Sequence, residues 1–240
     1  MDNNFLEDKK VIIFDLDGTL IDSIGMWNEM DQILIKETTG KKVELDILQK
    51  ERESITIQNN VGNVYEAYLK NMIKKYEIPY NFEYIMKRKL KIGDEYITKK
   101  IDYKDQADRV LKKLKEKGYI LVLATITSKK RIEQYNNENM NLVNKAKFDE
   151  IFDLILTTDD VKAKKPNPEV YLKVIEKLNV KPEECIVVED SIEGVTAAKK
   201  ANIEVINVVD SYSKENQDKI DKLSKYKFND FGEFLELLNM

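Results

Sequence analysis

Short apolar runs alternate with longer stretches of helical periodicity through the second half of the chain, and one further apolar run lies near its start. Aliphatic and β-branched runs of this kind are typical of strands that are buried on both faces of a parallel sheet. The predicted strands are Val11–Phe14, Tyr119–Ala124, Phe152–Leu156, Cys185–Val188 and Val205–Val209. Predicted helices separate the later strands, and an amphipathic helix over Asp230–Leu238 ends the pattern. Alternating strands and helices predict an α/β fold with a doubly wound, Rossmann-like parallel sheet.

The pattern between the first strand and the others is different. From about residue 21 to about residue 100 it is helical throughout, and no convincing strand interrupts it. The clearest helical segments are Ser23–Glu37, Val64–Tyr76 and Phe82–Ile97. Because the first strand belongs to the sheet, we predict an α/β core formed by residues 1–20 and 101–240, with residues 21–100 as an inserted all-helical domain.

Composition narrows the class of protein. Of the 240 residues, 42% are hydrophobic and 35% are charged, which indicates a globular protein with a highly charged surface. The net charge of −4 provides no broad basic field, so we expect no nucleic-acid partner. No apolar run approaches the length of a membrane span, and the N-terminus does not resemble a signal peptide. We therefore expect a cytoplasmic protein without a membrane partner, in which the single cysteine, Cys185, is a buried core residue.

The chain contains no histidine. This excludes Ser-His-Asp and Cys-His catalysis, phosphohistidine intermediates and histidine-ligated metal sites. Any chemistry must therefore depend on carboxylates, hydroxyls, lysines and a hard cation.

Two carboxylates, Asp15 and Asp17, follow the first predicted strand, and the turn-forming Gly18 comes next. Carboxyl ends of strands in open α/β sheets meet at the crevice where ligands bind. Acids at that place can supply a nucleophile, a proton donor and metal ligands. The alternative is an ordinary strand-to-turn junction with solvated aspartates.

Polar residues also follow three later strands. Thr125 follows the second, Lys165 lies in Lys165-Pro-Asn-Pro168 after the third, and Glu189-Asp190 ends the fourth. By charge alone, the neighbouring Lys164 could replace Lys165. Four carboxylates in one crevice repel one another unless a cation lies among them or some are protonated. Hard oxygen ligands of this kind suit Mg²⁺.

In this order, the four segments resemble the motifs of the haloacid dehalogenase-like (HAD) superfamily of phosphohydrolases. They are similar to its subfamily with a helical cap after the first motif, which includes phosphoglycolate phosphatases and β-phosphoglucomutases. The resemblance implies a Mg²⁺-dependent phosphatase that hydrolyses a small phosphorylated metabolite. It also implies that residues 21–100 form the cap, and it covers nearly all of the core but not the cap.

The resemblance implies a role for each matched residue. Asp15 would be the nucleophile that forms an aspartyl-phosphate, and Asp17 would be the general acid and then the general base. Thr125 and Lys165 would hold and neutralise the transferring phosphoryl oxygens, and the match to Lys-Pro-x-Pro favours Lys165 over Lys164. The Mg²⁺ ligands would be side-chain oxygens of Asp15 and Asp190, the backbone carbonyl of Asp17, and Glu189 either directly or through water.

Other activities can be weighed against this one. An acid at Asp17 argues against dehalogenases and phosphonate-cleaving relatives, which lack it. A sugar-phosphate mutase of the β-phosphoglucomutase type stays open, although such enzymes usually carry a cap histidine. A non-catalytic phosphometabolite-binding protein is the alternative from a different class. The sequence specifies neither the substrate nor the oligomeric state, and the polar cap residues that could meet a substrate fit solvated positions better: Arg52, Asn59, Asn60, Lys87 and Arg88.

Overall fold

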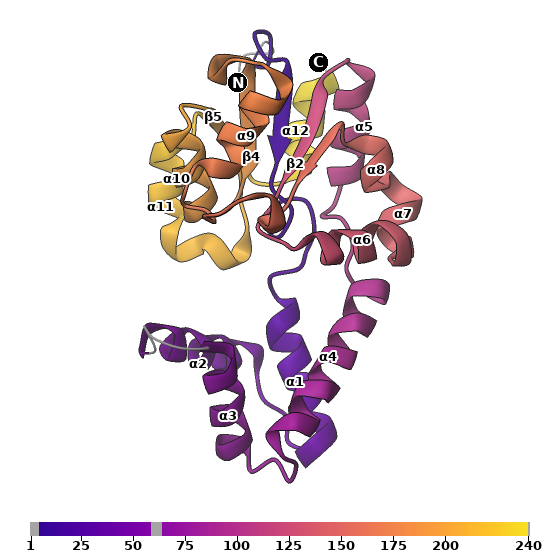
Figure 1. Ribbon diagram of the computed structural model, residues 1–240, viewed down its shortest axis with the longest axis vertical. Helices are drawn as coiled ribbons and strands as arrows, with labels where there is room; N and C mark the ends of the chain where they lie inside the picture. The colour runs from indigo at the N-terminus through magenta and orange to yellow at the C-terminus, as the bar shows by residue number, and fades with distance from the viewer. Residues whose placement is uncertain (1–4, 59–63, 240) are drawn as a thin grey trace. The chain divides into compact units, whose positions relative to one another are not determined.

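A six-stranded, fully parallel sheet is the centre of the fold in the computed structural model, which describes residues 5–58 and 64–239 (Figure 1). The strand order is β3-β2-β1-β4-β5-β6. The strands are β1 (Val11–Phe14), β2 (Ile120–Ala124), β3 (Leu154–Leu156), β4 (Cys185–Glu189), β5 (Glu204–Val208) and β6 (Tyr226–Phe228). The chain therefore runs outward from β1 in one direction through β2 and β3, and in the other direction through β4 to β6. This arrangement places a topological switch point at the carboxyl ends of β1 and β4.

Helices cover both faces of the sheet (Figure 1). One group packs together around β2 and β6, and its helices are α5 (Ala107–Glu116), α6 (Lys129–Glu138), α7 (Met140–Ala146), α8 (Phe148–Ile151) and α12 (Phe231–Asn239). The other group packs on β2, β4 and β5, and consists of α9 (Glu169–Leu178), α10 (Ile192–Lys200) and α11 (Gln217–Leu223). Three short 3₁₀ helices also occur: η1 (Thr158–Asp160), η2 (Pro182–Glu184) and η3 (Ser211–Asn216). The predicted α/β fold class is confirmed.

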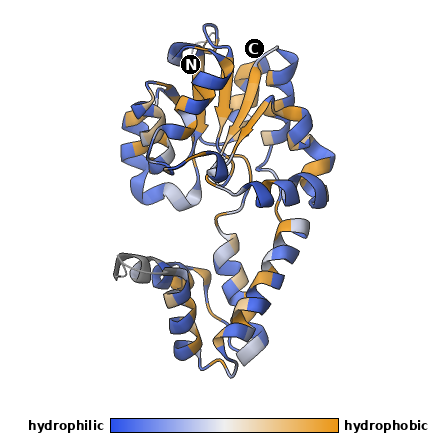
Figure 2. Ribbon diagram, in the orientation of Figure 1, coloured by the Kyte–Doolittle hydropathy of each residue, from blue (hydrophilic) through white to orange (hydrophobic). Residues whose placement is uncertain are grey.

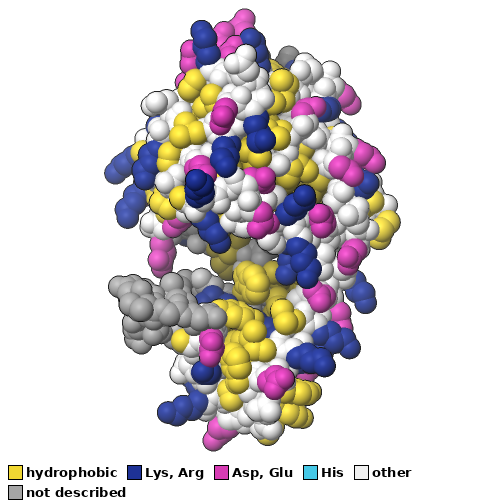
Figure 3. Space-filling model, in the orientation of Figure 1, with side chains coloured by type: hydrophobic (Ala, Val, Ile, Leu, Met, Phe, Trp, Pro, Cys, Tyr) yellow, Lys and Arg dark blue, Asp and Glu magenta, His cyan; other side chains and the backbone are white. Residues whose placement is uncertain are grey.

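The strands have the buried, apolar character that the sequence predicts. Every residue of β1 and β4 is buried, and the strands form a hydrophobic layer between helices whose outer surfaces are hydrophilic (Figure 2). The lone cysteine, Cys185, is among these core residues, as expected. On the face drawn in Figure 3, basic and acidic side chains are interspersed, in keeping with the similar numbers of basic (40) and acidic (44) residues in the sequence. None of the helices in the described part of the chain has the length and apolar character needed to cross a membrane.

The described chain divides into two compact units, residues 1–24 with 101–240 and residues 25–100. Within the first unit, the segment where the chain leaves for the helices and the segment where it returns lie side by side. Ile21 pairs with Tyr103, and the Lys104 N–H donates to the Leu20 carbonyl (2.9 Å). Its first segment extends through Ile24, slightly beyond the boundary at residue 20 that the sequence suggests.

The described residues of the second unit form four helices, α1 (Met26–Thr39), α2 (Leu45–Gln58), α3 (Val64–Tyr76) and α4 (Phe82–Lys99). One fully buried carboxylate on α1, Asp31, binds a side chain from each of the other three. It accepts hydrogen bonds from Arg52 of α2, from the Tyr68 hydroxyl of α3 (2.9 Å) and from Lys89 of α4, which is itself fully buried. A buried carboxylate with three donors fixes how these helices pack, because losing a partner leaves charge uncompensated in the interior.

Tyr68→Phe is expected to lower the free energy of unfolding by about 1 kcal/mol, because it removes one buried hydrogen bond to Asp31 and leaves the ring in place. Urea denaturation measures this loss. Tyr84→Phe is the matched control, since Tyr84 is 48% exposed and its substitution should change stability by less than about 0.5 kcal/mol. Equal stability of the two variants would contradict the role given to Tyr68.

Candidate active site

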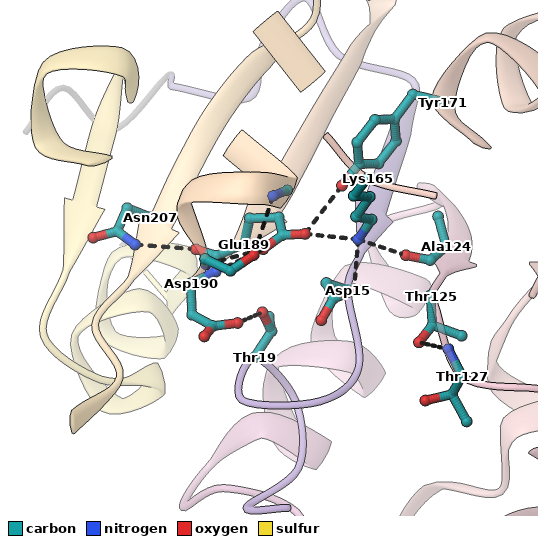
Figure 4. A network of polar contacts seen from close by, with 12 residues as sticks. Asp15, Thr19, Ala124, Thr125, Thr127, Lys165, Tyr171, Glu189, Asp190 and Asn207 are labelled. Atoms are coloured by element: carbon teal, nitrogen blue, oxygen red, sulfur yellow. Dashed lines mark hydrogen bonds and ion pairs between the residues drawn. The ribbon is translucent and has the colours of Figure 1, made fainter. Parts of the chain in front are cut away.

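The predicted site residues lie where four parallel strands end. Asp15 directly follows β1, and its backbone N–H donates to the Val188 carbonyl of β4 (3.0 Å). Glu189 is the last residue of β4. Thr125 follows β2, and its backbone N–H donates to the Leu156 carbonyl of β3 (3.0 Å). The sheet therefore brings residues that are far apart in the sequence to one edge (Figure 4).

Lys165 lies between two of these carboxylates. Its ammonium donates to Asp15 Oδ1 (2.6 Å), to Glu189 Oε1 (2.6 Å) and to the carbonyl of Ala124 (3.0 Å), and its side chain is only 4% exposed. Burial alone would lower the pKa of this ammonium, but the charges of Asp15 and Glu189 raise it well above its ordinary range. Lys165 is therefore a fixed positive charge. The adjacent Lys164 is exposed, which separates the two lysines that charge alone could not distinguish.

Glu189 is fully buried and fully hydrogen bonded. Besides Lys165, its Oε1 accepts from the Tyr171 hydroxyl (3.2 Å). Its Oε2 accepts from the backbone N–H groups of Asp190 and Ser191 (both 3.1 Å) and from the Ser191 hydroxyl (2.9 Å). A Cβ at position 194 would lie 1.6 Å from Oε1, so only glycine leaves room for this carboxylate beside α10.

Asp190, beside Glu189, is held by two hydroxyls. Thr19 Oγ1 donates to its Oδ1 (2.6 Å) and Ser213 Oγ donates to its Oδ2 (3.3 Å). Gly18 has a φ of +84°, and a Cβ there would approach Asp190 Oδ2 to 2.7 Å. The turn after β1 therefore needs glycine both for its left-handed backbone and for its close approach to this carboxylate.

The fourth predicted carboxylate, Asp17, is hydrogen bonded to two hydroxyls. Its oxygens accept hydrogen bonds from Ser23 Oγ (2.6 Å) and from Thr127 Oγ1. The group of side chains that could share a metal ion consists of Asp15, Glu189 and Asp190, so three of the four expected carboxyl groups come together. Thr125 is buried, and its Oγ1 accepts from the Thr127 N–H (3.0 Å), which links it to the hydroxyl beside Asp17.

The three clustered carboxyl groups provide the hard oxygen donors that a divalent cation requires, within 4.8 Å of one another. Burial, together with the charges of Glu189 and Asp190, raises the pKa of Asp15, and Lys165 only partly opposes the shift. Burial and the Glu189 charge raise the pKa of Asp190 from 3.8 to about 7. A self-repulsive buried cluster of this kind fits a cation, because a bound positive charge would stabilise its ionised form.

These shifts predict how the stability of the metal-free protein depends on pH. Since Asp15 and Asp190 bind protons more tightly in the folded state, stability should fall as pH rises from about 4 to about 7. A divalent cation competes with these protons, so Mg²⁺ should raise the melting temperature by several degrees near pH 8 and much less near pH 5. Differential scanning fluorimetry with Mg²⁺ and with EDTA at both pH values tests this. The same Mg²⁺ effect at the two pH values would contradict it.

Sequence reasoning did not identify several residues that complete the site: Thr19, Ser23, Thr127, Tyr171, Gly194 and Ser213. Thr127 carries a partial signal, because it is a hydroxyl close to the end of a predicted strand, whereas Ser23 stands at the start of a predicted helix. Tyr171 carries none, since it lies in a helix with ordinary apolar periodicity.

The sequence offers five polar residues of the helical unit as candidate substrate contacts. Arg52 binds Asp31, and Arg88 pairs with Glu37 (2.7 Å). Lys87 is exposed. Asn59 and Asn60 lie outside the described residues. These contacts give Arg52 and Arg88 structural partners within the helical unit.

The fold and the site define an α/β enzyme core in which a buried lysine holds carboxylates at the switch point of the sheet. Comparison with known proteins identifies the family. The family model described as haloacid dehalogenase-like hydrolase matches residues 12–208. The chain belongs to this family, as the sequence motifs predict.

Individual relatives cover most of the chain. A phosphorylated carbohydrates phosphatase from Thermotoga maritima is 30% identical over 202 residues, which are 82% of this chain and 83% of the relative. A phosphoglycolate phosphatase from Psychrobacter arcticus is 31% identical over 218 residues, with 86% of each chain covered. Among solved structures, a Thermotoga maritima protein provisionally assigned as a β-phosphoglucomutase is 28% identical, with a TM-score of 0.74 and coverage of 96% of this chain and 97% of that chain.

Proposed function

We propose that this protein is a Mg²⁺-dependent phosphatase that hydrolyses a small phosphorylated metabolite through an aspartyl-phosphate on Asp15. The observation that carries the proposal is the contact of Asp15 with the buried Lys165 ammonium, beside Asp190 and at the switch point of the sheet. The named activities of the Thermotoga maritima and Psychrobacter arcticus relatives support the same class of reaction. We assign residues 1–20 and 101–240 as the catalytic domain and residues 21–100 as the cap domain.

In the proposed mechanism, an Asp15 carboxylate oxygen attacks phosphorus in line with the leaving ester oxygen. Asp17 gives its proton to that oxygen as the P–O bond breaks. Asp17 then accepts a proton from water, which attacks the aspartyl-phosphate, releases inorganic phosphate and restores the Asp15 carboxylate. Asp17 is near the proposed phosphoryl-binding residue Thr125, since Thr127 donates to Asp17 through its hydroxyl and to Thr125 Oγ1 through its backbone N–H (3.0 Å).

Lys165 neutralises the charge on the nucleophile and on the equatorial phosphoryl oxygens. Thr125 and the backbone N–H groups after β2 bind the same oxygens. Asp15, Asp190 and the Asp17 carbonyl would hold Mg²⁺, which when bound supplies further compensation of phosphoryl charge.

Phosphate release from p-nitrophenyl phosphate, with Mg²⁺ and with EDTA, tests this function. A panel of sugar phosphates, phosphoglycolate and nucleotides then identifies the substrate class. Activity that requires Mg²⁺ is the expected result. Failure to release phosphate from any of these compounds would overturn the proposal and favour a phosphometabolite-binding protein.

A sugar-phosphate mutase is the second candidate, because the β-phosphoglucomutase-like structure is 28% identical over nearly the whole chain. The absence of histidine from the sequence favours the phosphatase. Incubation with β-glucose 1-phosphate separates the two activities, since a mutase forms glucose 6-phosphate and a phosphatase releases inorganic phosphate.

A further inference from the structure

We propose that Glu189 and Tyr171 are positioning residues that hold the Lys165 ammonium against Asp15, and that Glu189 is not a direct metal ligand. We call Glu189 and Tyr171 the lysine clamp. This inference rests on the proposed function, in which Lys165 compensates phosphoryl charge.

The hydrogen bonds of Glu189 show that its carboxylate is already fully occupied. An ionised carboxylate has about four lone-pair sites. The Glu189 oxygens already accept five hydrogen bonds, from Lys165, Tyr171, the Asp190 N–H, and the N–H and hydroxyl of Ser191. The side chain is fully buried, and the α10 backbone at Gly194 packs directly against it. A direct bond to a metal would require the carboxylate to give up donors that fix its orientation.

Asp190 has a different environment. Its two oxygens accept one hydrogen bond each, from Thr19 and Ser213. Lone-pair sites therefore stay available on Asp190, and in the cluster it and Asp15 are the better direct ligands.

Tyr171 contacts both Glu189 and the Lys165 ammonium. Its side chain is fully buried, its hydroxyl donates to Glu189 Oε1 (3.2 Å), and the centre of its ring lies 5.2 Å from Lys165 Nζ (Figure 4). The ring therefore contacts the ammonium while the hydroxyl orients the carboxylate that binds it. Together with the Ala124 carbonyl, these groups fix the position of the Lys165 ammonium, with Nζ 2.6 Å from Asp15 Oδ1.

The first experiment observes Lys165 directly, in metal-free protein without substrate. In a ¹H–¹⁵N correlation spectrum of lysine ammonium groups, buried and hydrogen-bonded Lys165 should give a signal protected from solvent exchange, assigned by its absence from Lys165→Met. Glu189→Gln should remove this signal, and Tyr171→Phe should shift or broaden it. Asp190→Asn should leave it in place. A wild-type-like Lys165 signal in both clamp variants would overturn the proposal.

The second experiment is a double-mutant cycle on turnover of p-nitrophenyl phosphate. We expect Glu189→Gln to lower kcat about 10- to 100-fold and Tyr171→Phe about 3- to 10-fold when Lys165 is present. In the Lys165→Met background both effects should shrink to less than about 3-fold, because the clamp acts through Lys165. Equal losses in the two backgrounds, with weaker Mg²⁺ binding by calorimetry in Glu189→Gln than in Asp190→Asn, would instead identify Glu189 as a ligand.

Tyr103→Phe is the control for loss of a buried hydroxyl in the same unit. The Tyr103 hydroxyl donates to the Ala146 carbonyl (2.5 Å) and to none of the site residues described above, so the Lys165 signal and kcat should be unchanged. Different results would refute the proposed function and the lysine clamp. A wild-type protein without phosphatase activity refutes the function, whereas the ammonium spectrum tests the clamp without turnover.

Discussion

Asp15→Asn is expected to lose phosphatase turnover by about 10³-fold or more while the protein stays folded. The amide that replaces the carboxylate is close to it in size but is not a nucleophile, so no aspartyl-phosphate can form. Folding should survive, because the substitution removes one charge from a buried group of three carboxyl groups and leaves Glu189 to pair with Lys165. Steady-state kinetics measures the first effect and thermal unfolding the second.

Asp8→Asn is the matched control for this substitution. Asp8 is exposed and precedes β1, whereas Asp15 follows the same strand at its other end. The control should therefore keep wild-type kinetics. An Asp15→Asn protein within about tenfold of wild-type activity, especially in the presence of EDTA, would contradict the mechanism.

The sheet could be predicted from the sequence because its strands are buried on both faces. Only a continuous apolar run satisfies such a position, so the run at Val11–Phe14 predicts β1 directly. The edge strand β6 escaped prediction, since it has three residues and one of them is the exposed Lys227. Helix α2 lies within the stretch predicted to be helical throughout, but its bounds could not be predicted, because most of its residues are polar and their spacing is only weakly amphipathic.

The site residues likewise divide into those that the sequence predicts and those that it does not. Asp15, Thr125 and Glu189 could be predicted, because each follows or ends an apolar strand and the topology of a parallel sheet brings such ends together. Tyr171 could not, since its partners Glu189 and Lys165 meet it only through tertiary packing of α9. The sequence also suggested four clustered carboxyl groups, whereas the group that could share a metal ion comprises three, and the Asp17 carboxylate accepts hydrogen bonds from Ser23 and Thr127. Side-chain direction depends on such local donors, which a motif does not record.

Lys165→Met is expected to lower kcat by about 10²- to 10³-fold, because it removes the fixed positive charge beside the reacting oxygens. It should also destabilise the protein by about 3 kcal/mol near pH 8, since the buried Asp15 and Glu189 lose their shared partner. The pKa of Lys165 is raised in the folded state, so its stabilising effect is present throughout the neutral range and is lost only well above pH 10.

The loss in stability should shrink at lower pH, where the unpaired carboxyl groups take up protons and no longer need a counter-charge. Lys164→Met removes the same side chain from the neighbouring, exposed position and should change neither kcat nor stability appreciably. Urea denaturation near pH 5 and pH 8, with kinetics on the same samples, measures both effects. If the two variants lost activity equally, the charge at this end of the sheet would act through the general field of the protein, and the contact between Lys165 and Asp15 would have no special role.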